Sequence, residues 1–404
     1  MEPITGTPFL IASVIKILVI FGMVLGLVAL WTLVERRVCA FMQNRLGPNR
    51  VGPQGLFQPV ADGLKNFLKE ESLPPFANRA LFVMAPMLAF TPALLTFSVI
   101  PMASPLPTPW GLVSTAIADL PVGFLFILAI SSLGVYGIAL AGWSSNNKYS
   151  LLGGLRASAQ LISYEIAMGL ASVSVLVLAG NITPHEIILR QHESFWYVGP
   201  LFVGFFVFLV AAFAETNRLP FDMPEAESEL IAGYHTEYSA MKFSMFFIAE
   251  YSNMLTASAL VVTLFFGGWD VFPGLAFSAP PWSVAKTIVT FFAFWAKTLF
   301  FYLLYIWIRW TLPRFRFDQL MDLGWKFLLP LALGYVMVIA VASWGLIASG
   351  IGLGHKGALA LTGLNVVLAA VLFLWFDRGR VIGGAAMRAR PAMRADMVSH
   401  LGGG

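Results

Sequence analysis

Long apolar runs constrain this chain more than any other feature of its sequence. About nine of them approach the ~20 residues that a helix needs to cross a bilayer, and only 11% of the 404 residues are charged. Soluble domains carry about a quarter charged residues, so we predict an all-α polytopic membrane protein with about nine transmembrane helices. The runs lie at about 11–34, 81–100, 121–143, 157–179, 196–214, 243–266, 284–308, 327–348 and 358–376.

The basic residues between these runs predict the orientation of the chain. Most of the 25 lysines and arginines fall in the tail or in the loops after the first, third, fifth and seventh runs. By the positive-inside rule these segments are cytoplasmic, which places the N-terminus outside and the C-terminus inside. No basic residue precedes Lys16, so we expect the first run to be a retained span and not a signal peptide.

The first loop, about 35–80, is long and cytoplasmic in this topology. Its segment 60–68 places apolar residues on one helical face, which predicts a short amphipathic helix at the membrane surface. A solvated surface helix is the alternative. Asp62 and Lys65 stand at i and i+3, within pairing distance on such a helix. The apolar face consists of Val60, Leu64, Phe67 and Leu68.

Three acids fall in the cytoplasmic half of the predicted membrane. Glu165 lies ~12 Å and Glu250 ~10 Å deep at 1.5 Å per helical residue, and Glu215 closes its run on the same side. An isolated ionised acid at this depth costs at least about 2.5 kcal/mol. We therefore expect these acids to share protons, bind water or pair with a base, and to carry protons in a working cycle. Permanently protonated structural acids are the alternative.

Other side chains extend this prediction. Tyr164 stands beside Glu165 and is expected to prolong a hydrogen-bonded chain, together with Tyr136 and Tyr251. Lys297 lies near mid-depth, too deep to reach the interface easily. We expect it to face the interior and either to pair with an acid or to hand on protons. Lys16 is near the outer end of its run and is expected to reach toward the headgroups.

The segment 213–241 concentrates negative charge between two apolar runs. It holds six of the chain's 21 acidic residues, with Arg218 as the only base in the acidic span. We predict that this segment lines a wet, charged cavity at a membrane face; a solvated acidic surface is the alternative. The spacing lacks the glycine of an EF-hand loop, so we predict no metal site. The acids are Glu215, Asp222, Glu225, Glu227, Glu229 and Glu237.

Redox ligands are missing from the sequence pattern. The single cysteine, Cys39, excludes a disulfide within the chain and a cluster held by cysteines of this chain alone. The five histidines fall outside the apolar runs, and no glycine-rich phosphate loop is present. If the protein serves a redox reaction, a partner must carry the electrons.

Four segments in order carry a family resemblance. They are GPNRVGPQGLFQPVADGLK (47–65), GWSSNNKYSLLGGLRASAQLISYE (142–165), AETNRLPFDMPEAESELIAGYHTEYSAMKF (214–243) and AEYSNM (249–254). They resemble the NADH dehydrogenase subunit 1 family of respiratory complex I, which is the H-type subunit family of bacterial NADH:quinone oxidoreductase. This resemblance implies a core membrane subunit that forms most of the quinone chamber and couples quinone reduction to proton translocation.

The resemblance also assigns roles to residues. Glu35, Arg36, Asp62 and Lys65 match positions around the chamber entrance and surface helix, and Arg218 matches the partner base of the acidic loop. We add Phe221 to this chamber set. With Tyr164 and Lys297 included, the predicted proton relay comprises Glu165, Glu215, Glu250, Asp222, Glu225, Glu227, Glu229, Glu237, Tyr164 and Lys297.

Cofactors and partners follow from the same resemblance. It implies quinone (ubiquinone or menaquinone) as substrate, with NADH, FMN and iron–sulfur clusters held by partner subunits. The implied partners are the peripheral-arm quinone-site and terminal iron–sulfur subunits, and small membrane subunits toward the antiporter-like subunits; no nucleic acid is expected. The implied location is a bacterial inner membrane.

One feature departs from the family's usual eight spans. The run at 358–376 predicts a ninth helix, so we divide the chain into an eight-helix chamber domain (1–350) and an added helix with a basic cytoplasmic tail (351–404). The ninth helix is expected to dock an accessory partner or to contact lipid, and Asn365 is a weak polar mark in it. Two alternatives remain open: the equivalent subunit of a membrane-bound hydrogenase-type complex, and a standalone ion transporter, although no inverted repeat supports the latter.

Overall fold

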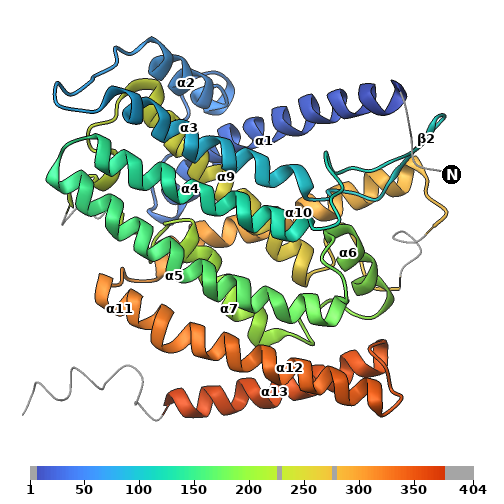
Figure 1. Cartoon of the computed structure of the whole chain (residues 1–404). Helices are drawn as coiled ribbons and strands as arrows, with labels where there is room; N and C mark the ends of the chain where they lie inside the picture. Colours follow the sequence, from blue (N-terminus) through green and yellow to red (C-terminus); the bar gives the residue numbers. More distant parts are fainter. Residues whose placement is uncertain (1–6, 225–229, 275–279, 378–404) are drawn as a thin grey trace, which may run out of the picture.

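The computed structural model describes residues 7–224, 230–274 and 280–377, and these ranges fold into a bundle of long helices (Figure 1). The long helices are α1 (Thr7–Met42), α3 (Arg79–Leu95), α4 (Gly123–Ser144), α5 (Lys148–Ala179), α9 (Ala240–Phe265), α10 (Val284–Thr311), α12 (Leu329–Ala348) and α13 (His355–Asp377). The short helices are α2 (Gln58–Leu68), α6 (Pro184–Glu193), α7 (Phe202–Glu215) and α11 (Phe317–Asp322). The short 3-10 helices are η1 (Pro53–Gly55), η2 (Thr96–Val99) and η3 (Gly233–His235), and η5 (Leu323–Leu328) is a π-helical stretch between α11 and α12. The strands β1 (Leu106–Thr108) and β2 (Gly111–Val113) form an antiparallel hairpin.

The all-α polytopic architecture is confirmed, with one difference in span length. Within the described ranges, eight helices are long and apolar enough to cross a membrane. The fifth predicted run, 196–214, forms α7, which has only 14 residues and rises about 21 Å at 1.5 Å per residue. Gly199 and Pro200 explain the late start, because the chain there makes a turn before the helix begins at Phe202.

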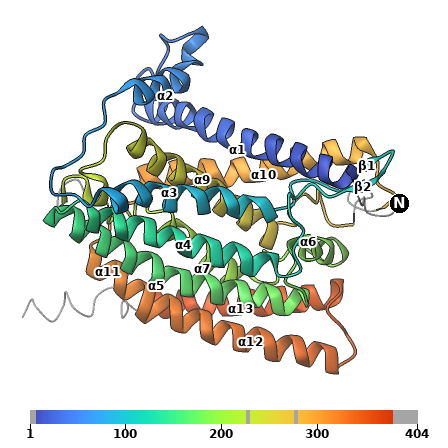
Figure 2. The same ribbon diagram turned by 45° about the horizontal axis from the view of Figure 1, so that its top comes forward.

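The helices lie roughly side by side, and their connections gather at two ends of the bundle (Figure 2). Helix α2 and helix α11 mark one end, while the start of α1, the β hairpin and α6 mark the other. Helices α5 and α9 are central. Of an apolar stretch of 18 residues in each helix, 56% is buried in α5 and 67% in α9. The basic first and seventh loops therefore share one end, as the loop charges predict.

The amphipathic helix of the first loop is confirmed as α2. It packs against α1 and α9, and none of its residues is buried. Val60, Leu64, Phe67 and Leu68 remain 57–73% exposed, so their apolar face is free to contact lipid. Asp62 forms its ion pair with Arg36 of α1 at 2.6 Å; the pairing with Lys65 inferred from spacing is replaced by a contact between two helices.

The ninth run forms α13, which packs against α7 and α12 at one edge of the bundle. The division of the chain at residue 350 stays a prediction. The basic tail at 378–404 lies outside the described residues.

Candidate functional site

A buried charge cluster joins three helices at the end of the bundle that carries α2. Arg218 contacts Glu35 of α1 at 3.1 Å and forms an ion pair with Glu250 of α9. Arg309, at the end of α10, pairs with the same Glu35 carboxylate, and the Tyr251 hydroxyl donates to Glu35 at 2.6 Å. Two acids and two bases thus balance in charge, which lets them remain ionised at low exposure.

Arg218 is the centre of this cluster. It is 9% exposed, and its guanidinium lies 4.6 Å from the centre of the Tyr251 ring. Burial alone would lower the pKa of Arg218, but the carboxylates of Glu250 and Glu35 raise that pKa well above its ordinary value. Arg218 therefore holds a fixed positive charge between two carboxylates.

The local sequence explains how Arg218 reaches this position. Helix α7 ends at Glu215, and Asn217 adopts a left-handed backbone with φ of 53°, a conformation that asparagine tolerates well. The Gln160 amide of α5 donates to the carbonyls of Ala214 and Phe221, each at 2.8 Å. This brace turns the chain sharply, so that Glu215 and Arg218 point toward different cavities.

The first of these cavities, here called the polar chamber, measures about 550 Å³. The charge cluster forms one wall, and basic side chains from α1 and the first loop form another. Such a cavity suits a polar head group that gains negative charge during a reaction. Its lining is Glu35, Arg36, Cys39, Arg45, Pro48, Asn217, Arg218, Leu219, Asp222, Phe247, Glu250, Tyr251, Arg309 and Trp310.

A second cavity of about 510 Å³, here called the entry groove, lies between α1, α2 and α9. Its wall is largely apolar, with Leu25, Val28 and Ile248 among its residues. It shares Arg36, Phe247 and Tyr251 with the polar chamber, so the two cavities meet at these side chains. The predicted residues Asp62 and Lys65 line this groove and not the chamber.

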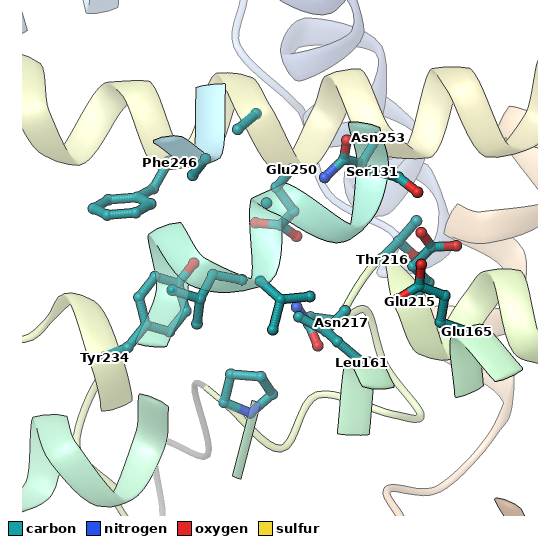
Figure 3. A pocket seen from close by; sticks show the side chains of 16 residues that line it. Ser131, Leu161, Glu165, Glu215, Thr216, Asn217, Tyr234, Phe246, Glu250 and Asn253 are labelled. Atoms are coloured by element: carbon teal, nitrogen blue, oxygen red, sulfur yellow. The ribbon is translucent and has the colours of Figure 1, made fainter. Parts of the chain in front are cut away.

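The third cavity, here called the inner cavity, lies among α3, α4, α5, α7 and α9 and measures about 50 Å³, room for about three waters. Glu165, Glu215 and Glu250 all line it. Figure 3 shows Glu165 and Glu215 together on one side, with Glu250, Ser131 and Asn253 around the rest of the space. The structure therefore brings the three intramembrane glutamates of the sequence to one polar cavity.

Glu250 and Asn217 line both the polar chamber and the inner cavity. A smaller space of about 30 Å³ continues from the inner cavity and shares Ser131, Glu215 and Asn253 with it. Polar side chains thus extend from the chamber, through Glu250, to the pair Glu215 and Glu165.

Other predicted site residues lie beside these cavities. The Tyr164 hydroxyl donates to the Leu320 carbonyl at 2.9 Å, and Phe221 packs against Tyr164 and Phe315. Among the described residues, Tyr164 and Phe221 belong to none of the three linings. Both side chains support the turn that carries Arg218.

The described acids of the loop have separate partners. Asp222 lines the polar chamber and lies 4.0 Å from Arg314. Glu237 accepts a hydrogen bond from the Asn147 amide at 2.7 Å. Glu225, Glu227 and Glu229 lie outside the described residues. No group of three potential metal ligands gathers in the part of the chain that the structure describes.

Lys297 is partly buried and holds the end of α9. Its ammonium group donates to the backbone carbonyls of Phe266, at 2.7 Å, Gly268 and Asp270, and lies 4.2 Å from the centre of the Trp196 ring. Within the described residues, Lys297 does not line the inner cavity. The partners of Lys297, which the sequence did not indicate, are therefore backbone carbonyls just after the end of α9.

Sequence analysis did not identify several residues of the site. Arg309 has no mark in the sequence beyond its basic charge, and its place in the last turn of α10 puts it beside Glu35. Ser131 and Asn253 do not stand out because small polar residues are common in membrane helices. The signal for Asn217 was its place between a predicted span and Arg218 in an acid-rich loop.

Comparisons with known proteins identify the family of the chain. A family model described as NADH dehydrogenase matches residues 15–340. The chain is 50% identical to an H-type subunit of the NADH-quinone oxidoreductase of Koribacter versatilis, over 82% of this chain and 97% of the relative. It is 52% identical to NADH-quinone oxidoreductase subunit 8 of Rhodothermus marinus, over 76% and 90% respectively. It is 49% identical to the H-type subunit of the Leptospira biflexa enzyme, over 81% and 93%.

Proposed function

The chain belongs to the NADH dehydrogenase family, as a membrane subunit of the NADH-quinone oxidoreductase (complex I) type, and from that premise we propose that its polar chamber receives the quinone head group. The entry groove supports this proposal, because an apolar channel open between α1, α2 and α9 suits an isoprenoid tail arriving from lipid. Arg36 and Tyr251, which line both cavities, mark the point where head group and tail separate.

Quinone reduction takes two electrons and two protons and yields quinol. In this proposal the electrons come from an iron–sulfur cluster of a partner subunit, while NADH and FMN act further away in the peripheral arm. This chain contributes fixed charge. Arg218, Arg309 and Arg36 stabilise negative charge that develops on the head group before protons arrive.

Glu250 carries the coupling step of the proposal, because it lines both the polar chamber and the inner cavity. Negative charge on the head group draws Arg218 toward the chamber and weakens its pairing with Glu250. Glu250 then takes up a proton, which passes by waters and polar side chains to Glu215 and Glu165. Asp222 and Glu237, with the acids outside the described residues, form the charged approach to this path.

The same proposal assigns surroundings to the subunit. The end of the bundle with α2, the polar chamber and the basic loops faces the cytoplasm and docks the peripheral arm. The helices lie in the bacterial inner membrane, with the start of α1 outside. Small membrane subunits contact this chain on the path toward the antiporter-like subunits.

Glutamate-to-glutamine variants in the assembled complex test the coupling step. In proteoliposomes, Glu250→Gln and Glu165→Gln should each lower NADH-driven proton uptake and quinone turnover together, because glutamine keeps the shape but binds no exchangeable proton. Glu193→Gln, an exposed acid of α6 paired with Arg190, is the matched control. Proton uptake at the wild-type level with both Glu165 and Glu250 replaced would remove the relay from the account.

A further inference from the structure

The short helix α7 begins inside the bundle, with polar groups that need partners. It spans about 21 Å, less than the ~30 Å of a hydrocarbon core. Its N-cap residue, Leu201, offers no side-chain hydrogen bond. The first amides of a helix have no intrahelical acceptor, and leaving them unpaired away from water costs several kcal/mol each.

These partners come from α13, which is bonded in turn to α12. The Asn365 side-chain oxygen accepts from the Val203 amide at 3.3 Å, and its side-chain nitrogen donates to the Pro200 carbonyl. The Tyr335 hydroxyl donates to the same Asn365 oxygen at 2.8 Å. Asn365 is 0% exposed, so α13 supplies to α7 the cap that most helices take from their own chain.

Two glycines let the three helices approach closely. A Cβ at Gly204 would lie 2.8 Å from the Tyr335 ring, and one at Gly199 would lie 3.3 Å from the Thr362 hydroxyl oxygen. The three helices are therefore closely fitted here, and the Asn365 side chain bonds to both α7 and α12 across the contact. A helix that merely touched lipid would need neither feature.

The other end of α7 carries the proton relay. Glu215 is its last residue, and Thr216 and Asn217 follow it into the lining of the inner cavity. A continuous helix is stiff along its axis, so a shift at Val203 moves Glu215 as well. We propose that Asn365 is a positioning residue: by capping α7 from α13, it fixes where Glu215 stands in the inner cavity. This inference rests on the proposed function of Glu215.

The test uses Asn365→Leu, which keeps the volume but removes both hydrogen-bonding groups, in the complete membrane complex. We expect faster amide exchange at Val203, and coupled turnover lower by on the order of tenfold, since misplacement by about 1 Å can cost more than that. The change should fall on turnover more than on the KM for quinone, because Glu35, Glu250 and Arg309 of the chamber stand on α1, α9 and α10. Ser343→Ala, which removes another buried hydroxyl of α12, is the control and should behave as wild type.

A rescue separates positioning from general damage. Cysteines in place of Gly199 and Thr362 stand close enough for a disulfide, and this tether should restore turnover to Asn365→Leu. If that variant fails to assemble, Tyr335→Phe removes one link of the cap and should show the same change more weakly.

The inference is overturned if the Asn365→Leu complex assembles and has the turnover and amide exchange of the wild type. It is also overturned if the disulfide forms in Asn365→Leu and restores no turnover. If Asn365→Leu does not assemble, a Tyr335→Phe complex with the turnover and amide exchange of the wild type overturns it. Glu215→Gln is measured in parallel. Wild-type proton uptake in that variant would instead refute the relay role of Glu215.

Discussion

Replacing Arg218 with methionine tests the charge cluster most severely. The change removes the 3.1 Å contact with Glu35, the ion pair with Glu250 and the cation–π contact with Tyr251 at 4.6 Å. Breaking a buried ion pair by removing one partner costs about 3–5 kcal/mol. We expect the lower end, about 3 kcal/mol, because Glu35 keeps Arg309 and the Tyr251 hydroxyl as partners.

This cost falls on the stability of the assembled complex. In the kinetics, removing one group that stabilises developing negative charge costs about 10²–10³ in rate, so we expect roughly a 100-fold loss of kcat/KM for a water-soluble quinone. The assay is NADH-driven quinone reduction by membranes that contain equal amounts of assembled complex. Lys326→Met removes a cation that is 73% exposed and paired with Asp322, and it should leave kcat/KM unchanged.

A double-mutant cycle with Glu250→Gln then isolates the pairing. If Arg218 and Glu250 act as a pair, the double variant should be little worse than Arg218→Met alone, with an interaction energy of about 1–3 kcal/mol. Strictly additive losses, or an Arg218→Met enzyme with wild-type kcat/KM, would refute the argument that this cluster is an electrostatic unit.

Three further predictions concern the groove, the brace and the buried lysine. Asp62→Asn weakens the ion pair with Arg36 at the entry groove. It should raise the KM for a long-tailed quinone several-fold at equal kcat, and an unchanged KM would show that this ion pair has no part in quinone entry. Gln160→Leu removes the side-chain donor from the Ala214 and Phe221 carbonyls, which keep backbone donors at Asn217 and Met223. The loss of two hydrogen bonds should lower the stability of the complex by about 1–3 kcal/mol, seen as an earlier thermal loss of activity; identical thermal inactivation would show that the brace is dispensable. Lys297→Met removes the ammonium donor from three carbonyls and should also lower thermal stability. In the complex that assembles, the number of protons translocated per electron should be unchanged; a lower number would instead place Lys297 in the relay.

The apolar runs determined most of the fold in advance. Every predicted run contains a helix of the structure. In hydrocarbon the backbone N–H and C=O groups must bond to one another, and a helix pairs them within one segment. The short length of α7 was not predicted, since hydropathy does not distinguish a straight span from a turn followed by a short helix. The Gly199–Pro200 pair was the available signal.

The candidate site was predicted in its acids and in Arg218, but not in the other partners of these acids. Glu165, Glu215 and Glu250 stood out because acids in apolar runs are rare. Their convergence on one cavity depends on how α5, α7 and α9 pack, which periodicity within one helix cannot give. The same limit explains the pairing of Asp62. Its partner is Arg36 on another helix and not Lys65, three residues further along α2.

Two partly buried lysines show this limit most clearly. Lys16 was expected to reach toward headgroups, yet its ammonium group donates to the Ala116 carbonyl at 2.9 Å. Lys297 likewise binds carbonyls at the end of another helix. Such partners are backbone atoms of irregular segments, and their position follows from the tertiary fold and not from residue type.

The central claim is that Glu250 changes its protonation when quinone is reduced in the neighbouring chamber. Infrared difference spectroscopy of the assembled complex, oxidised against reduced, reports protonation of single carboxyl groups directly. We predict a carboxyl band in the wild-type difference spectrum that disappears in Glu250→Gln, while quinone is still reduced. A difference spectrum in Glu250→Gln identical to that of the wild type would contradict the account.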